Sequence, residues 1–149
     1  MTPQEQAIVD QAMQILDRHI KAHPFAASSP DAVRRYLRIK LEQQERELFC
    51  VLFLDAQNHI LAFEEMFLGS LTECRVYPRE IARAALGHNA AAVILAHNHP
   101  SGVSTPSQPD ITLTKALADA LSPLDIRILD HLVVGAGEIS SLAEKGLMP

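Results

Sequence analysis

Residues 91–110 read AAVILAHNHPSGVSTPSQPD, and this stretch sets the frame of the fold. A short apolar run, typical of a buried strand, leads directly into His97 and His99. On an extended segment, side chains at positions i and i+2 share a face, so we expect both imidazoles to project together. A loop stiffened by three prolines then returns the chain to Asp110, at the start of an expected helix. The stretch predicts two imidazoles and one carboxylate at one point.

Two histidines and one aspartate offer three metal ligands. A zinc site with three protein ligands keeps a fourth position for water, whose pKa falls towards about 7 and which can then attack a carbonyl group. An H-x-H pair alone is more often a surface or capping feature, so the metal site depends on Asp110 joining the pair. Ser107 has two readings, as the N-cap of the following helix or as a hydroxyl that faces the site.

Apolar periodicity outside this stretch predicts an α/β chain. We expect a first helix over residues 4–20, a second within residues 28–46 with Ser29 as its N-cap and Pro30 at its first position, a third from Pro78 to Gly87, and a fourth from about Asp110. Expected strands cover residues 47–55 and 60–69 as a hairpin, then 91–96 and 126–135. Residues 139–146 are expected to form a closing turn or a short helix. The pattern predicts a mixed sheet with helices packed on it.

Composition limits the possible functions. The 149 residues fit one domain, and the formal charge of −5 disfavours sequence-independent DNA binding. Cys50 and Cys74 do not form a C-x-x-C pair, and we expect both to be reduced thiols in the core. The sequence begins without a signal-peptide pattern and contains no apolar run of about 20 residues, so we expect a cytoplasmic protein without membrane contact. The oligomeric state is left open.

Three motifs carry a resemblance to a known family. His97-x-His99-Pro100, six residues, then Ser107-x-x-Asp110 resembles the JAMM signature of JAB/MPN domain metallopeptidases. The segments VYPREI, AAVILAHNHPSG and LDHLVVG resemble the RadC-type branch of that superfamily, over residues 29–146. The resemblance implies a cytidine-deaminase-like mixed sheet flanked by helices. It divides the chain into an N-terminal helix and linker, residues 1–28, and a RadC-like JAB/MPN domain, residues 29–149.

The resemblance also implies an activity and its residues. It implies a zinc-dependent metallohydrolase, a JAMM-type peptidase or isopeptidase that cleaves an amide bond of a peptide or protein substrate with metal-activated water. His97, His99 and Asp110 are the implied zinc ligands, and Ser107 is the implied donor to the tetrahedral intermediate. Glu47, where a helix meets the first core strand, is the implied general base on the water.

Other glutamates could serve as the base. Glu65, and with less support Glu64, are the rivals of Glu47, because strand phase puts Glu65 on one face with apolar residues and so predicts its burial. Asp130 and His131 are adjacent on a strand and must point to opposite faces. We expect His131 to be a hydrogen-bonded structural histidine, with support of a metal ligand as the alternative.

Two other functions remain as alternatives. One is a DNA-repair-associated DNA-binding protein or nuclease, and the other is a non-catalytic JAB/MPN module that binds a partner. The consecutive letters His97-Asn98-His99 do not match HNH nucleases, whose motif residues are spread over a ββα unit. RadC proteins usually carry an N-terminal helix-hairpin-helix region, whereas one helix and a linker precede the shared domain here, so strong nucleic-acid binding is not expected.

Overall fold

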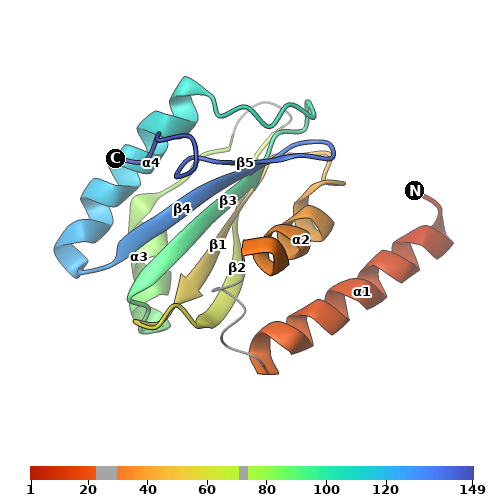
Figure 1. The fold of residues 1–149 in the computed structure, drawn as a ribbon, viewed down its shortest axis with the longest axis horizontal. Coiled ribbons are helices and arrows are strands. Elements are labelled where there is room, and N and C mark those ends of the chain that lie inside the picture. Colours follow the sequence, from red (N-terminus) through yellow and green to blue (C-terminus); the bar gives the residue numbers. More distant parts are fainter. Residues whose placement is uncertain (23–29, 71–73) are drawn as a thin grey trace.

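A computed structural model of the protein describes residues 1–22, 30–70 and 74–149 and contains one five-stranded sheet (Figure 1). The strands lie in the order β2-β1-β3-β4-β5. β3 and β4 are parallel, and all other neighbours are antiparallel. The strands are β1 (Leu48–Leu54), β2 (Ile60–Leu68), β3 (Ala92–Asn98), β4 (Arg127–Val134) and β5 (Ile139–Ser141). The expected mixed sheet is therefore confirmed.

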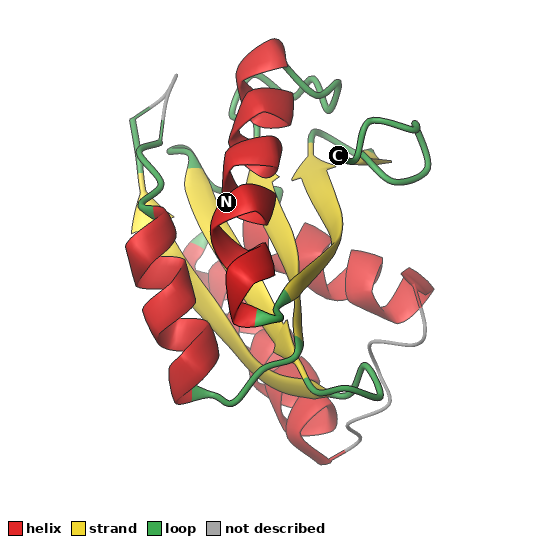
Figure 2. Cartoon of the chain, turned by 90° about the vertical axis from the view of Figure 1, so that its left-hand side faces the viewer, coloured by secondary structure: helices red, strands yellow, loops and turns green. Residues whose placement is uncertain are grey.

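Helices cover both faces of this sheet (Figure 2). On one face, α3 (Pro78–Gly87) and α4 (Gln108–Leu121) pack through residues such as Ile81 and Leu117. On the other face, α2 (Pro30–Leu41) packs through residues such as Leu37 and Leu41. The central strands β1 and β3 are buried along their whole length, as expected for strands with helices on both sides.

The connection between the parallel strands positions the candidate site. Parallel neighbours need a crossover, and α4 supplies it between β3 and β4. The loop that leaves β3 and enters α4 therefore lies at the carboxyl ends of both strands. In open α/β sheets this edge is the usual place for a ligand site.

Most expected elements are present, with two differences. The hairpin, the helix beginning at Pro78 and the helix entered through Ser107 are confirmed. Residues 139–146 were expected to form a turn or short helix, but Ile139–Ser141 pair with β4 as an edge strand before a turn. α2 begins at Pro30 but ends at Leu41. The predicted N-cap Ser29 and most of the linker lie outside the described residues.

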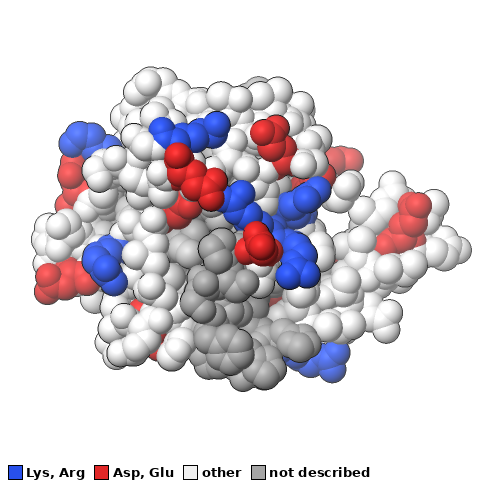
Figure 3. Space-filling model, in the orientation of Figure 1, with Lys and Arg blue, Asp and Glu red and all other residues white. Residues whose placement is uncertain are grey.

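Helix α1 (Pro3–Ala22) lies at the periphery, against α2 and β2. Asp17 attaches it to α2 by accepting a hydrogen bond from Tyr36 at 2.6 Å and lying 3.7 Å from the Lys40 ammonium. No described helix is both long and apolar enough to span a membrane. Basic and acidic side chains are interspersed on the face that Figure 3 draws.

Candidate metal centre

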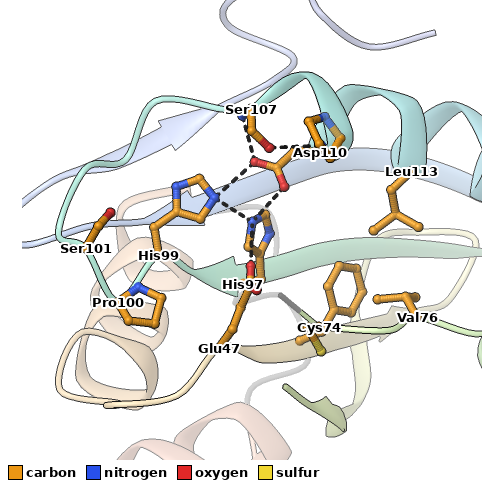
Figure 4. Close-up of a pocket in the computed structure, with 12 residues that line it drawn as sticks. Glu47, Cys74, Val76, His97, His99, Pro100, Ser101, Ser107, Asp110 and Leu113 are labelled. Carbon is orange, nitrogen blue, oxygen red and sulfur yellow. Dashed lines mark hydrogen bonds and ion pairs between the residues drawn. The ribbon is translucent and has the colours of Figure 1, made fainter. Parts of the chain in front are cut away.

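Two histidines meet at the carboxyl end of β3. His97 is 2% exposed and lies between Phe49 of β1 and Val133 of β4 in the sheet register. Its Nε2 lies 3.0 Å from Nε2 of His99, so the two rings project together as the i, i+2 spacing predicts (Figure 4). His99 Nδ1 lies 2.8 Å from the Val103 carbonyl oxygen. Because that oxygen can only accept, Nδ1 donates there and Nε2 faces the site.

Asp110 reaches the same point from the first turn of α4. Its Oδ1 lies 3.2 Å from His97 Nε2, and its Oδ2 lies 3.0 Å from His99 Nε2. Ser107 is the N-cap of α4 and forms a capping box with Asp110: the Ser107 hydroxyl accepts from the Asp110 amide, and the Asp110 carboxylate accepts from the Ser107 amide. The cap fixes the carboxylate next to both imidazoles.

Glu47 lies directly before β1, and its side chain points to the histidines. Its Oε1 lies 3.8 Å from His97 Nε2, and its side chain is 12% exposed. The backbone around it is held by hydrogen bonds in both directions, from the Glu47 amide to the Ser70 carbonyl and from the Gly69 amide to the Glu47 carbonyl. The site therefore contains a second carboxylate in addition to Asp110.

Asn98 holds the segment that carries Glu47. Its side chain points away from the two histidines, as strand alternation predicts, and is buried. The side-chain oxygen accepts from the Leu48 amide at 2.7 Å, and the side-chain nitrogen donates to the carbonyls of Gln44 and Arg46. This contact was not predicted, because its one signal in the sequence is a polar residue between the two histidines.

Charge at the site is strongly coupled. Burial opposes ionisation of Asp110, but the imidazole rings of His97 and His99 beside the carboxylate outweigh it and hold the pKa of this carboxyl well below its usual range. The hydrogen bond to Asp110 also raises the pKa of His99, against the opposing effect of burial. The carboxylate is therefore ionised at neutral pH, as a metal ligand must be.

His131 contacts His97 from behind, on β4. It is 0% exposed, and its Nε2 lies 2.8 Å from His97 Nδ1. Its Nδ1 lies 2.6 Å from the Thr114 hydroxyl. Burial holds the pKa of His131 well below its usual value, so the ring is neutral. Asp130 points elsewhere and accepts from the Ser141 hydroxyl and the Ala143 amide.

The histidines open onto a pocket of about 640 Å³. One side of the pocket carries the polar groups, and the other carries Val76, Leu113 and Cys74 (Figure 4). Phe49 also lines the pocket, with its ring stacked on that of His97 at a centroid distance of 5.9 Å. Cys50 is a buried free thiol as predicted, but Cys74 is only half-buried and lines this pocket. Cys74 therefore packs against the edge of the core as a free thiol, and is not fully buried within it.

Glu65 is exposed, contrary to the burial that strand phase predicts. A bulge also separates Glu65 from Phe67, which strand phase places on the same face: Phe49 pairs with Phe67, but the next residue, Cys50, pairs with Glu65. Directly paired residues share a face, so Glu65 faces the α2 side with Cys50, whereas His97 faces the α4 side with Phe49. Glu64 lies 3.2 Å from the His88 ring, away from the pocket-lining residues.

The grouped side chains fit a metal ion. Glu47, His97 and His99 each offer one ligand atom, all within 4.8 Å of one another, so this cluster could hold a metal. The separations from Asp110 to the two histidine nitrogens, 3.2 Å and 3.0 Å, fit more closely still. Ligands at about 2.0–2.1 Å from a tetrahedral zinc lie about 3.3 Å apart. Imidazole and carboxylate are also ligand types that zinc accepts.

Comparisons with known proteins show the family to which this chain is similar. The sequence model of a family described as RadC-like JAB domain matches residues 27–147. A UPF0758 protein of Cellvibrio japonicus is 53% identical over 143 residues, which cover 96% of this chain and 63% of that protein. The UPF0758 protein YkfG of Escherichia coli is 50% identical over 148 residues, 99% of this chain and 94% of YkfG. The chain thus spans less than two thirds of the first relative and nearly all of the second.

Proposed function

This chain belongs to the RadC-like JAB domain family, and from that premise we propose that it is a zinc-dependent hydrolase of amide bonds, a JAMM-type peptidase or isopeptidase. One observation carries the proposal: two imidazole nitrogens and two carboxylates converge at the mouth of a pocket large enough for a residue-sized group. Packing alone does not explain a buried polar cluster of this kind. Apolar residues would fill the same space without the free-energy cost of removing charged groups from water.

His97, His99 and Asp110 are the proposed zinc ligands. Both carboxylate oxygens of Asp110 already lie beside imidazole nitrogens, and the helix cap holds that carboxylate in place. When bound, zinc supplies Lewis-acid activation of water and of a carbonyl group at neutral pH. Three protein ligands leave one position open, as catalytic zinc sites require.

Glu47 is the proposed general base. It lies on the opposite side of His97 from Asp110 in the close-up view, and its Oε1 is farther from His97 Nε2 than either Asp110 contact (Figure 4). In this role Oε1 takes a proton from the attacking water and returns it to the leaving amine. Because only 12% of the side chain is exposed, the carboxylate is largely screened from solvent.

Ser107 is the proposed donor to the oxyanion. Its hydroxyl oxygen accepts from the Asp110 amide at 3.2 Å, and the hydroxyl hydrogen is not used in that contact. The residue lines the pocket and can therefore donate to an oxygen of the substrate. One such donor is worth roughly 3 kcal/mol in other enzymes. The capping role and the donor role are compatible because they use different parts of the hydroxyl.

The apolar side of the pocket favours a substrate with an apolar group beside the scissile amide. Val76 and Leu113 lie on this side (Figure 4), and Phe49, which also lines the pocket, stacks on His97 of the polar cluster. A peptide or protein substrate supplies both features, an amide for the polar side and an aliphatic or aromatic side chain for the other.

A hydrolysis screen tests the proposal. Zinc-loaded protein is incubated with fluorogenic peptides that carry apolar or charged residues beside the cleaved bond, with isopeptide-linked substrates and with duplex DNA. We expect amine release from at least one amide, lost with a chelator and restored by zinc. Zinc-dependent DNA cleavage without amide cleavage would favour the nuclease alternative, and binding of zinc without any turnover would favour a partner-binding module.

A further inference from the structure

One buried series of hydrogen-bonded side chains has no role in the proposed reaction. It runs from His97 on β3 through His131 on β4 to Thr114 on α4, and both His131 and Thr114 are 0% exposed. The links are 2.8 Å from His97 Nδ1 to His131 Nε2 and 2.6 Å from His131 Nδ1 to the Thr114 hydroxyl. A third link of 2.7 Å joins this hydroxyl to the carbonyl oxygen of Asp110.

The hydrogen bond from Thr114 to the Asp110 carbonyl determines which atom donates in each of the other hydrogen bonds. A carbonyl oxygen can only accept, so the Thr114 hydroxyl must donate its single hydrogen to Asp110. Towards His131 the hydroxyl can then only accept, and His131 must carry a hydrogen on Nδ1. A neutral imidazole has one N–H, so His131 Nε2 is an acceptor, and His97 donates to it from Nδ1.

The surroundings favour a neutral His131. The ring is fully buried, with Phe49 at an edge-on angle and a centroid distance of 5.6 Å. The carboxylate of neighbouring Asp130 is turned to the Ser141 hydroxyl and two backbone amides, one of them that of His131. A charged ring in such a place would be costly without an ion partner at its own nitrogens, and both nitrogens contact uncharged or imidazole groups.

We propose that His131 and Thr114 are positioning residues, which keep the ring proton of His97 on Nδ1 and so direct the Nε2 lone pair of His97 into the site. This inference rests on the proposed function only in naming zinc as the occupant of that site. The other end of this series of hydrogen bonds is the backbone carbonyl of Asp110. The series therefore connects the helix that carries one proposed ligand to the strand that carries another.

Nuclear magnetic resonance of the metal-free protein tests the arrangement directly. Long-range proton–nitrogen spectra at pH 8 distinguish a ring protonated on Nδ1 from one protonated on Nε2. We expect His131 with its proton on Nδ1 alone, and His97 with a proton on Nδ1. A proton on Nε2 of His131 would overturn the proposal, whether or not the protein binds zinc.

Two substitutions at Thr114 add a functional readout. Thr114→Val keeps the shape of the side chain but removes the acceptor for His131, so the proton of His131 can move to Nε2 and force that of His97 onto its own Nε2. We expect zinc affinity to fall about 10- to 100-fold, as for other groups that support metal ligands. Thr114→Ser keeps the hydroxyl and is the matched control, with affinity within about threefold of wild type.

The outcomes separate this proposal from the proposed function. Equal zinc affinity in Thr114→Val and Thr114→Ser would overturn the positioning role, since both variants keep the buried ring and differ in the hydroxyl. Failure of the wild type to bind zinc would contradict the proposed function, while the spectra of the metal-free protein would still decide how the two rings are protonated.

Discussion

Glu47 and Glu65 both lie beside β1, but their side chains lie on opposite sides of the sheet. The Glu47 carboxylate lies 3.8 Å from His97 Nε2, whereas Glu65 is exposed on the side of α2. A general base must come within hydrogen-bond distance of the water that attacks the substrate. Of these two residues, only Glu47 meets that requirement.

Glutamine substitutions separate the two residues experimentally. Glu47→Gln removes the proton acceptor and keeps the shape, so we expect activity on any substrate found in the screen to fall about 10²- to 10⁴-fold with zinc binding retained. Glu65→Gln is the matched control and should lose little activity. Steady-state kinetics with zinc content measured in parallel give the answer, and the assignment passes to Glu65 if the two results are reversed.

The Cys74 thiol reports on the charge of Glu47. Burial, and then the nearby Glu47 charge, raise the pKa of Cys74 to about 11. Burial also raises the pKa of Cys50. Only about one Cys74 thiol in a thousand is then ionised at pH 8, and the thiolate is the reactive form. We expect iodoacetamide to modify both thiols at least about fiftyfold more slowly in the folded than in the unfolded protein.

The variant Glu47→Gln extends this measurement. Loss of the negative charge should lower the pKa of Cys74 and accelerate its alkylation, while Cys50 serves as the internal reference. Mass spectrometry of digested samples over pH 8–10 measures both rates. An unchanged Cys74 rate in Glu47→Gln would mean that the Glu47 carboxylate is not close to this thiol in solution.

Single residues show what the sequence could predict about the site. The spacing of His97, His99 and Asp110 was sufficient to predict that they meet, because strand alternation and a helix N-terminus are local rules. The contacts of Asn98 with residues 44–48 and of His131 with His97 join segments distant in the chain. Such contacts depend on strand register, which the sequence of one segment does not determine.

The loop from β3 to α4 is the element on which the site depends. The His99 amide donates to the Val134 carbonyl, and the Ala136 amide donates to the Gly102 carbonyl, so the loop lies directly on the end of β4. Gly135 permits this approach, since a Cβ there would lie 2.5 Å from the Gly102 oxygen and 2.7 Å from the Ser104 nitrogen. Both neighbours are backbone atoms, which cannot rotate away.

A methyl group at Gly135 should therefore disturb the site. We expect Gly135→Ala to lower the free energy of unfolding by about 1–3 kcal/mol through overpacking, and to weaken zinc binding because the loop carries His99. Gly87→Ala is the control, since a Cβ there meets nothing within 4 Å. Urea unfolding and zinc titration of both variants check this prediction, and equal behaviour of the two would refute the role given to Gly135.

For helices and strands, predictions from the sequence are wrong where tertiary contacts override the local pattern. The chain after Leu41 keeps residues that favour helix, yet α2 ends there, and Asn98 binds the carbonyls of Gln44 and Arg46 instead. The three residues of β5 are too few for a strand pattern and are recognisable only by their pairing with β4. The bulge in β2 likewise placed Phe67 and Glu65 on opposite faces of the sheet, although strand phase predicts one face for both.

In the whole molecule, the sheet and α2, α3 and α4 surround the core, and α1 lies outside it. The proposed site residues all come from the sheet, α4 and the segments joined to them. α1 contributes Leu16 to the edge of the core and the Asp17 contacts with α2, but none of the pocket-lining residues. The predicted division at residues 28 and 29 is therefore open to a direct test.

Removal of residues 1–28 provides that test. We expect the remaining chain to fold with a free energy of unfolding lower by about 1–3 kcal/mol, from the loss of one charge-assisted hydrogen bond and some apolar burial. Zinc affinity should stay within about threefold of the full chain. Circular dichroism, thermal unfolding and zinc titration of both forms are the measurements, and an unfolded truncated chain would contradict the proposed domain boundary.

The central claim is that His97, His99 and Asp110 bind one zinc ion while Glu47 does not coordinate it. Calorimetric titration of metal-free protein with zinc chloride tests this claim most directly. We predict one zinc per chain for the wild type and for Glu47→Gln, and a loss of affinity of more than about a hundredfold for Asp110→Asn and for the double variant His97→Ala/His99→Ala. No zinc binding by the wild type, or a loss in Glu47→Gln equal to that in Asp110→Asn, would contradict it.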